Sequence, residues 1–107
     1  MIYWGSLGVA IAFEVLGTLS LKYSSLHNSQ LAGWLTLIFY IVSFSLMWYA
    51  IKKIDISVAY AIWAGLGTAL ITLVGAKLFD EVLTPLKLLF VSLIIIGVVG
   101  LKYISEN

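Results

Sequence analysis

The sequence predicts an all-α integral membrane protein, with four transmembrane helices forming one domain over residues 1–107. Composition is the first observation behind this prediction. Hydrophobic residues make up 63% of the chain and charged residues only 10%, whereas roughly a quarter of residues are charged in an average soluble domain. The second observation is that four apolar windows follow one another along the chain. Each is long enough to cross a bilayer core about 30 Å thick, which takes about 20 helical residues.

The first three windows span about residues 3–21, 31–51 and 56–76. Only Glu14 interrupts the first, and the second and third contain no charged residue. Apolar residues run continuously through them rather than alternating with polar ones, which favours helices over the strands of a membrane β-barrel. The chain begins without the basic segment and cleavage site of a signal peptide, so we expect the first helix to be retained.

The fourth window spans about residues 85–103 and begins at Pro85, which suits the first turn of a helix. Lys87 and Lys102 lie near its two ends, where long amines can reach the membrane surface. We expect short polar loops between the windows, at residues 22–30, 52–55 and 77–84.

The lysines beside the membrane give no preferred orientation, although such residues usually set the topology. One side would carry three of them and the other side also three: Lys52, Lys53 and Lys102 against Lys22, Lys77 and Lys87. A chain without bias can insert both ways, which is compatible with an antiparallel dimer. A fixed orientation set by other features is the alternative.

Glu14 is the one carboxylate at membrane depth, about ten residues into the first window. At 1.5 Å per residue, this places it roughly 15 Å deep, near the bilayer midplane. An ionised carboxylate is costly there unless a cation, a proton or water meets it, so such residues usually mark a transport pathway. We therefore predict a proton switch at Glu14. The alternative is a structural carboxyl group held neutral by a neighbouring hydroxyl.

Helical spacing places Ala10 and Thr18 on the same face as Glu14. In the third window, Tyr60 and Trp63 share a face about a turn inside the membrane. A carboxylate beside two aromatic rings would make a receptor for an organic cation, because it combines electrostatic with cation–π attraction. Helix packing explains Ala10 equally well. Contact with lipid is an equally good explanation for the two rings.

Other small and polar residues in the windows suggest supporting roles. Tyr40 and Ser43 form part of a polar-edged stripe in the second window, compatible with a cavity lining. Gly65 and Gly67 would permit a kink in the third window, and the alternative for them is close helix packing. Gly97 in the fourth window suits helix association.

Several classes of site are not predicted. The chain has no cysteine, no acidic pair within a window and no glycine-rich phosphate loop, so we expect no metal and no cofactor. A formal net charge of +1 gives no basic patch for nucleic acid.

Two segments resemble the first and third helices of the small multidrug resistance transporters. They are AIAFEVLGT at 10–18, followed by Lys22, and AYAIWAGLG at 59–67. Phe79-Asp80-Glu81 and Gly97 agree as well, so the resemblance covers nearly the whole chain.

The resemblance implies a multi-pass exporter of the inner membrane, not an enzyme. It would work as an antiparallel dimer that exchanges protons for organic cations, with Glu14 binding proton or substrate in alternation. The implied pocket contains Glu14 with Ala10, Thr18, Tyr40, Ser43, Tyr60 and Trp63. Gly65 and Gly67 would form the hinge and Gly97 a dimer contact.

Departures from the family pattern leave the substrate open among quaternary ammonium, polyamine and guanidinium-like cations. The guanidinium branch usually has a Trp shortly after the glutamate, where this chain has Leu16-Gly17-Thr18, which is closer to the multidrug and paired-subunit branches. We expect a homodimer, with a heterodimer containing a paired subunit as the alternative. Phe90 replaces a glycine of some members.

Two other functions are compatible with an intramembrane carboxylate. One is a non-transporting membrane subunit in which Glu14 is structural. The other is a rotor-type subunit that carries protons only, although this would leave Tyr60 and Trp63 without a role.

Overall fold

The computed structural model describes residues 1–105 and contains four α-helices. They are α1 (Ile2–His27), α2 (Gln30–Ala50), α3 (Ile56–Leu78) and α4 (Pro85–Ser105). All four are long and apolar enough to cross a membrane. The described residues contain no β-strand. The predicted class of a four-helix integral membrane protein is therefore confirmed.

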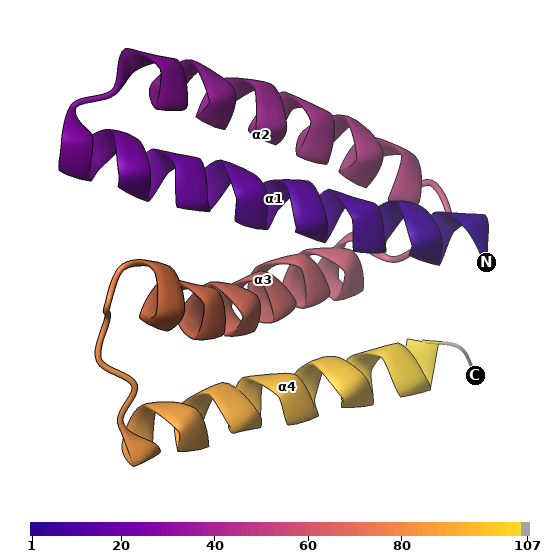
Figure 1. Ribbon diagram of the computed structural model, residues 1–107. Helices are drawn as coiled ribbons and strands as arrows, with labels where there is room; N and C mark the ends of the chain where they lie inside the picture. Colours follow the sequence, from indigo (N-terminus) through magenta and orange to yellow (C-terminus); the bar gives the residue numbers. More distant parts are fainter. Residues whose placement is uncertain (106–107) are drawn as a thin grey trace.

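The helices lie side by side in the order α2, α1, α3, α4, with short connections between successive helices (Figure 1). The resulting slab measures 46 × 34 × 17 Å. Because α1 packs against both α2 and α3, it occupies an inner position in the slab, and Glu14 lies midway along it. The helix order thus places the carboxylate between two neighbouring helices.

Helix α1 is longer than the sequence indicated, since the predicted loop at 22–30 is helical as far as His27. Residues 22–27 contain no glycine or proline, so polarity alone does not stop the helix. It ends at Asn28, whose left-handed backbone (φ 51°) directs its N–H to the carbonyl oxygen of Ser24. The Ser29 hydroxyl then caps α2 by accepting from the Ala32 N–H at 3.2 Å.

The apolar core lies where α1 meets α2 and α3. Leu7, Ile11 and Val15, spaced four residues apart on α1, pack against residues such as Ala59 and Ile62 of α3. Helix α4 contributes no fully buried residue and packs mainly against α3. Most of the α4 surface is therefore available to lipid or to another protein chain.

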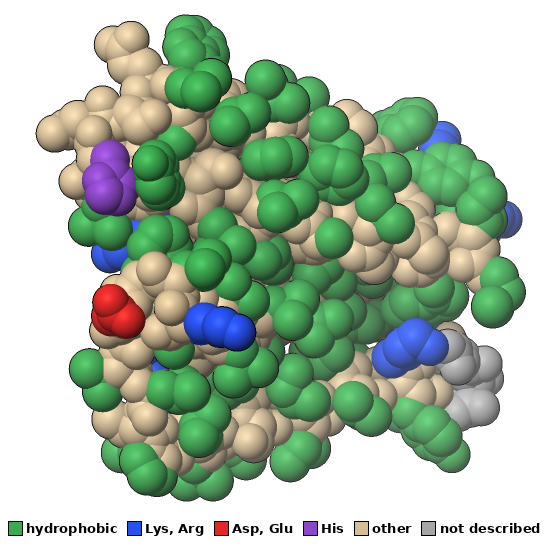
Figure 2. Space-filling view, viewed as in Figure 1, with side chains coloured by type: hydrophobic (Ala, Val, Ile, Leu, Met, Phe, Trp, Pro, Cys, Tyr) green, Lys and Arg blue, Asp and Glu red, His purple; other side chains and the backbone are tan. Residues whose placement is uncertain are grey.

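The outer surface matches a lipid environment. Hydrophobic side chains cover most of the face in Figure 2, while charged side chains gather towards its two ends. Large apolar side chains are exposed along α2, among them Leu37, Ile41 and Trp48. Such a surface would be unstable in water but is favourable in hydrocarbon.

Candidate functional site

Glu14 lies against the backbone of α3 at Gly67. A Cβ atom added to Gly67 would overlap the Glu14 carboxylate, so any other residue would require the carboxylate to move. Glu14 Oε1 is buried and has no hydrogen-bond partner among the described residues. A buried polar atom without a partner is uncommon and often marks a site for a ligand or proton.

A cavity of about 260 Å³ lies beside Glu14, between α1 and α3, and is called the Glu14 cavity below. It is lined by Glu14, Thr18, Ala64, Gly67, Thr68, Ile71 and Thr72. Glu14 is the only residue with an acidic or basic side chain in this lining. Within residues 1–105, no three acidic, histidine or cysteine side chains meet where they could hold a metal ion.

Ser43 of α2 is hydrogen-bonded to both α1 and α3. It is fully buried, and its hydroxyl donates to the Ala10 carbonyl oxygen at 2.7 Å. The Ser43 hydroxyl oxygen in turn accepts from the Trp63 indole N–H at 3.1 Å. The structure thus brings Ala10, Ser43 and Trp63 together, and Ala10 takes part through its backbone.

Thr18 and Tyr40 join α1 to α2, with their hydroxyl oxygens 2.6 Å apart. The Tyr40 ring lies over Gly17, where an added Cβ atom would be 2.8 Å from ring atom Cδ1. Gly17 therefore lets the ring approach the α1 backbone closely. Thr18 also lines the Glu14 cavity.

Tyr60 and Trp63 form a ring pair, with centroids 5.9 Å apart and planes inclined at 30°. Phe44 of α2 lies next to them, its centroid 5.5 Å from that of Trp63. These three residues line an aromatic cavity of about 440 Å³ between α2 and α3, together with Met47, Ile51, Ile56 and Ser57.

From the sequence, the ring pair was predicted to lie beside Glu14 in one receptor. Within a single chain, however, Tyr60 and Trp63 line the aromatic cavity and Glu14 lines a different one. The reason is that Trp63 turns towards Ser43 of α2, whereas Gly67, four residues further on, faces α1. Helical periodicity places Trp63 and Gly67 on the same side of α3 but does not show which neighbouring helix each of them contacts.

Two polar residues of the Glu14 cavity were not among the residues predicted from the sequence. Thr68 and Thr72 of α3 are lining residues that were assigned no role. Their spacing of four places both hydroxyls on one face of the helix, beginning next to Gly67. That spacing could have indicated a polar cavity lining. It is a weak signal, because threonines in membrane helices commonly donate hydrogen bonds to their own backbone.

Gly65 and Gly67, the predicted hinge, lie within the uninterrupted helix α3. A Cβ atom at Gly65 would be 2.9 Å from Val98 Cγ2 and 3.0 Å from Ile94 Cγ2 of α4. The two glycines thus allow close packing on opposite neighbours, and their role as a hinge stays a prediction. A Cβ at Gly97 would meet nothing within 4 Å, so this part of α4 has open space around it.

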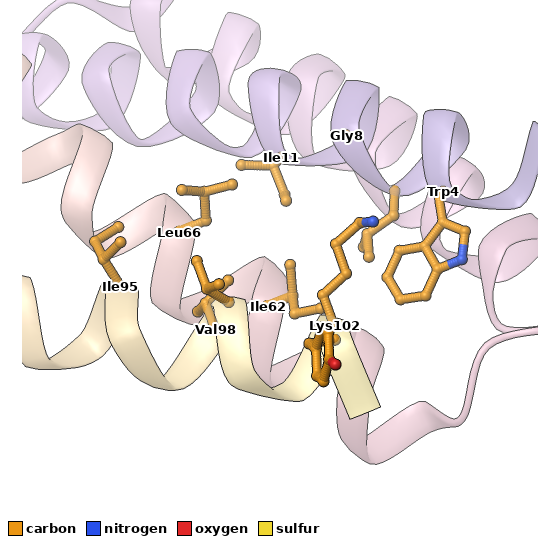
Figure 3. A pocket seen from close by; sticks show the side chains of 11 residues that line it. Trp4, Gly8, Ile11, Ile62, Leu66, Ile95, Val98 and Lys102 are labelled. Atoms are coloured by element: carbon orange, nitrogen blue, oxygen red, sulfur yellow. The ribbon is translucent and has the colours of Figure 1, made fainter. Parts of the chain in front are cut away.

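A third cavity, of about 470 Å³, is lined by residues of α1, α3 and α4. Figure 3 shows its apolar walls, which include Ile11, Leu66 and Val98. The Lys102 side chain crosses from α4 towards α1, with Nζ 5.0 Å from the ring centroid of Trp4. None of the predicted site residues lines this cavity.

These features define a class: a four-helix integral membrane protein with a lone carboxylate in an intramembrane cavity. The family model described as Small Multidrug Resistance protein matches residues 2–94. The chain is also 44% identical over 103 residues to a relative from Bacillus subtilis (strain 168) described as the uncharacterized membrane protein YvaE. This match covers 96% of the present chain and 87% of the relative. The protein therefore belongs to the small multidrug resistance family, whose members are small-molecule transporters rather than enzymes.

Proposed function

We propose that this protein is a proton-coupled antiporter that exports small organic cations, and that Glu14 binds a proton and the cation in alternation. The observation that carries the proposal is the buried, partnerless Oε1 atom of Glu14 in an intramembrane cavity. An ionised carboxylate in that position needs a positive charge for compensation. A proton and an organic cation can each supply it, which makes the two ligands competitors.

The competition gives a transport cycle. Deprotonated Glu14 binds the cation while the cavity is open to one side of the membrane. A conformational exchange then opens it to the other side, where protons displace the cation. The two states must be similar in energy for this exchange to be rapid, because a ligand shifts an equilibrium only by its differential affinity.

We propose that the transporting unit is an antiparallel homodimer with two Glu14 residues. The balanced lysines support dual insertion, and the exposed, apolar α4 with open space at Gly97 supports a helix contact there. Tyr60 and Trp63 are proposed as substrate-binding residues because they line the aromatic cavity. Ala10, Thr18, Tyr40 and Ser43 would hold this arrangement through the hydrogen bonds described above.

The test is transport by purified protein in proteoliposomes under an imposed pH gradient. Uptake of guanidinium or of tetramethylammonium is expected with the wild type and should be abolished in Glu14→Gln. Asp55→Asn is the matched control, since Asp55 lies at the start of α3 and its side chain makes no capping hydrogen bond. Gradient-driven uptake that persists in Glu14→Gln would rule out coupling at this residue. Absence of any cation-dependent proton release would favour the non-transporting subunit.

A further inference from the structure

Thr68 and Thr72 offer only acceptor lone pairs to the Glu14 cavity. The Thr68 hydroxyl donates to the Ala64 carbonyl oxygen at 2.7 Å, and the Thr72 hydroxyl donates to the Thr68 carbonyl oxygen at 2.8 Å. A hydroxyl has one proton and two lone pairs. Because each proton is already used within α3, each oxygen can only accept a hydrogen bond from a ligand.

The Glu14 carboxylate adds further acceptors to the same space. An ionised carboxylate cannot donate a hydrogen bond, and its Oε1 atom has no partner in the described residues. Thr18 is not counted, because either Thr18 or Tyr40 could donate in the bond between them. The cavity therefore presents a negatively charged set of acceptors from Glu14, Thr68 and Thr72, and the matching ligand is a cation with several donors.

The cavity lacks the feature that recognises cations without donors. Quaternary ammonium ions are typically bound against aromatic faces, yet no aromatic side chain lines the Glu14 cavity among the described residues. The rings of Phe44, Tyr60 and Trp63 line the aromatic cavity instead. A volume of about 260 Å³ is also below the roughly 300–1,000 Å³ typical of drug-sized ligand sites.

We propose that the cation bound at Glu14 carries N–H groups, as an ammonium or guanidinium ion does, and that Thr68 and Thr72 accept hydrogen bonds from it. The inference rests on the proposed function and narrows its substrate class. Quaternary ammonium ions bind more weakly at this site, because they leave the acceptors unsatisfied while displacing water from them. Thr68 and Thr72 are thereby specificity-determining residues.

The first test uses wild-type protein in detergent and pairs of cations in which methyl groups replace the N–H hydrogens. Hexylammonium is compared with hexyltrimethylammonium, and guanidinium with hexamethylguanidinium. Binding is followed by calorimetry and by proton release into a weakly buffered solution. We expect the N–H-bearing member of each pair to bind at least about tenfold more tightly, as charge-assisted hydrogen bonds would give.

The second test removes the acceptors. Thr68→Val with Thr72→Val deletes both hydroxyls at nearly constant volume, and Thr68→Ser with Thr72→Ser retains them. The valine variant should bind hexylammonium about tenfold more weakly and hexyltrimethylammonium unchanged, while the serine variant should resemble the wild type. Ser45→Ala is the control, because the Ser45 hydroxyl also bonds its own helix but lies outside the cavity.

The outcomes separate the two proposals. Equal or tighter binding of the quaternary ions, with proton release, would overturn the N–H preference and leave the antiporter intact. An equal loss of both cation types in the valine variant would show that the hydroxyls are structural, which also overturns the inference. If no cation of either type releases protons, the proposed function fails and the inference fails with it.

Discussion

Gly67 of α3 lies so close to Glu14 of α1 that a Cβ atom at position 67 would overlap Glu14 Oε1 and lie 2.8 Å from its carboxyl carbon. The backbone of α3 at Gly67 thus forms one wall of the cavity that holds the Glu14 side chain of α1. This relationship makes position 67 the most direct way to disturb Glu14 without changing its charge.

Gly67→Ala should displace the carboxylate from its place in the cavity. We expect cation-dependent proton release to fall at least about tenfold, together with a loss of about 1–3 kcal/mol in stability from overpacking. Titration of the detergent-solubilised variant measures the first, and thermal unfolding followed by circular dichroism measures the second. Gly5→Ala is the control, since nothing lies within 4 Å of a Cβ there. Wild-type affinity in Gly67→Ala would contradict the close contact.

Ser43→Ala should leave the Trp63 N–H without its partner. An unsatisfied buried donor costs about 1–3 kcal/mol, and we expect a loss of that size in the stability of the detergent-solubilised protein. In a Trp63→Phe background the donor is already absent, so the same substitution should cost less. A double-mutant cycle measures this coupling. Additive effects of the two substitutions would show that the hydrogen bond contributes nothing.

Gly65→Ala separates the packing of this glycine from its predicted role as a hinge. The added methyl group would meet Val98 Cγ2 at 2.9 Å, which is too close for ordinary contact. If packing against α4 is the constraint, Val98→Ala should restore part of the transport lost in Gly65→Ala, because it removes the nearer of the two colliding methyl groups and leaves Ile94 Cγ2 at 3.0 Å. Uptake assays on the single and double variants make the comparison. Failure of the second substitution to rescue, with normal thermal stability, would instead favour the hinge.

Asn28 sets the end of α1 through its left-handed backbone, with φ 51° and ψ 39°. Glycine adopts this conformation without strain, so Asn28→Gly should be as stable as the wild type. A β-branched residue adopts this conformation only with strain. Asn28→Val should therefore lower the stability of the protein by about 1–2 kcal/mol. Thermal unfolding of both variants in detergent tests the pair. Equal stability of Asn28→Gly and Asn28→Val would contradict the left-handed turn.

Much of the fold could be predicted because bilayer hydrocarbon imposes a simple rule on sequence. Four apolar windows of this length require four helices, since every backbone polar group must be satisfied within its own segment. The end of α1 was misplaced for a related reason. Polar residues 22–27 mark where a helix leaves the hydrocarbon, but a helix ends only where backbone geometry changes, as it does at Asn28.

The sequence by itself determined that this is a membrane protein, and it predicted that Glu14 lies near the midplane, where a charge needs compensation. These conclusions depend on composition and on distance along one helix. Tertiary structure alone decided which surfaces meet: Gly67 against Glu14, Trp63 against Ser43, and Thr68 and Thr72 in the Glu14 cavity. The physical reason is that helical periodicity fixes the angles between side chains, whereas the rotation of each helix about its axis is set by packing with its neighbours.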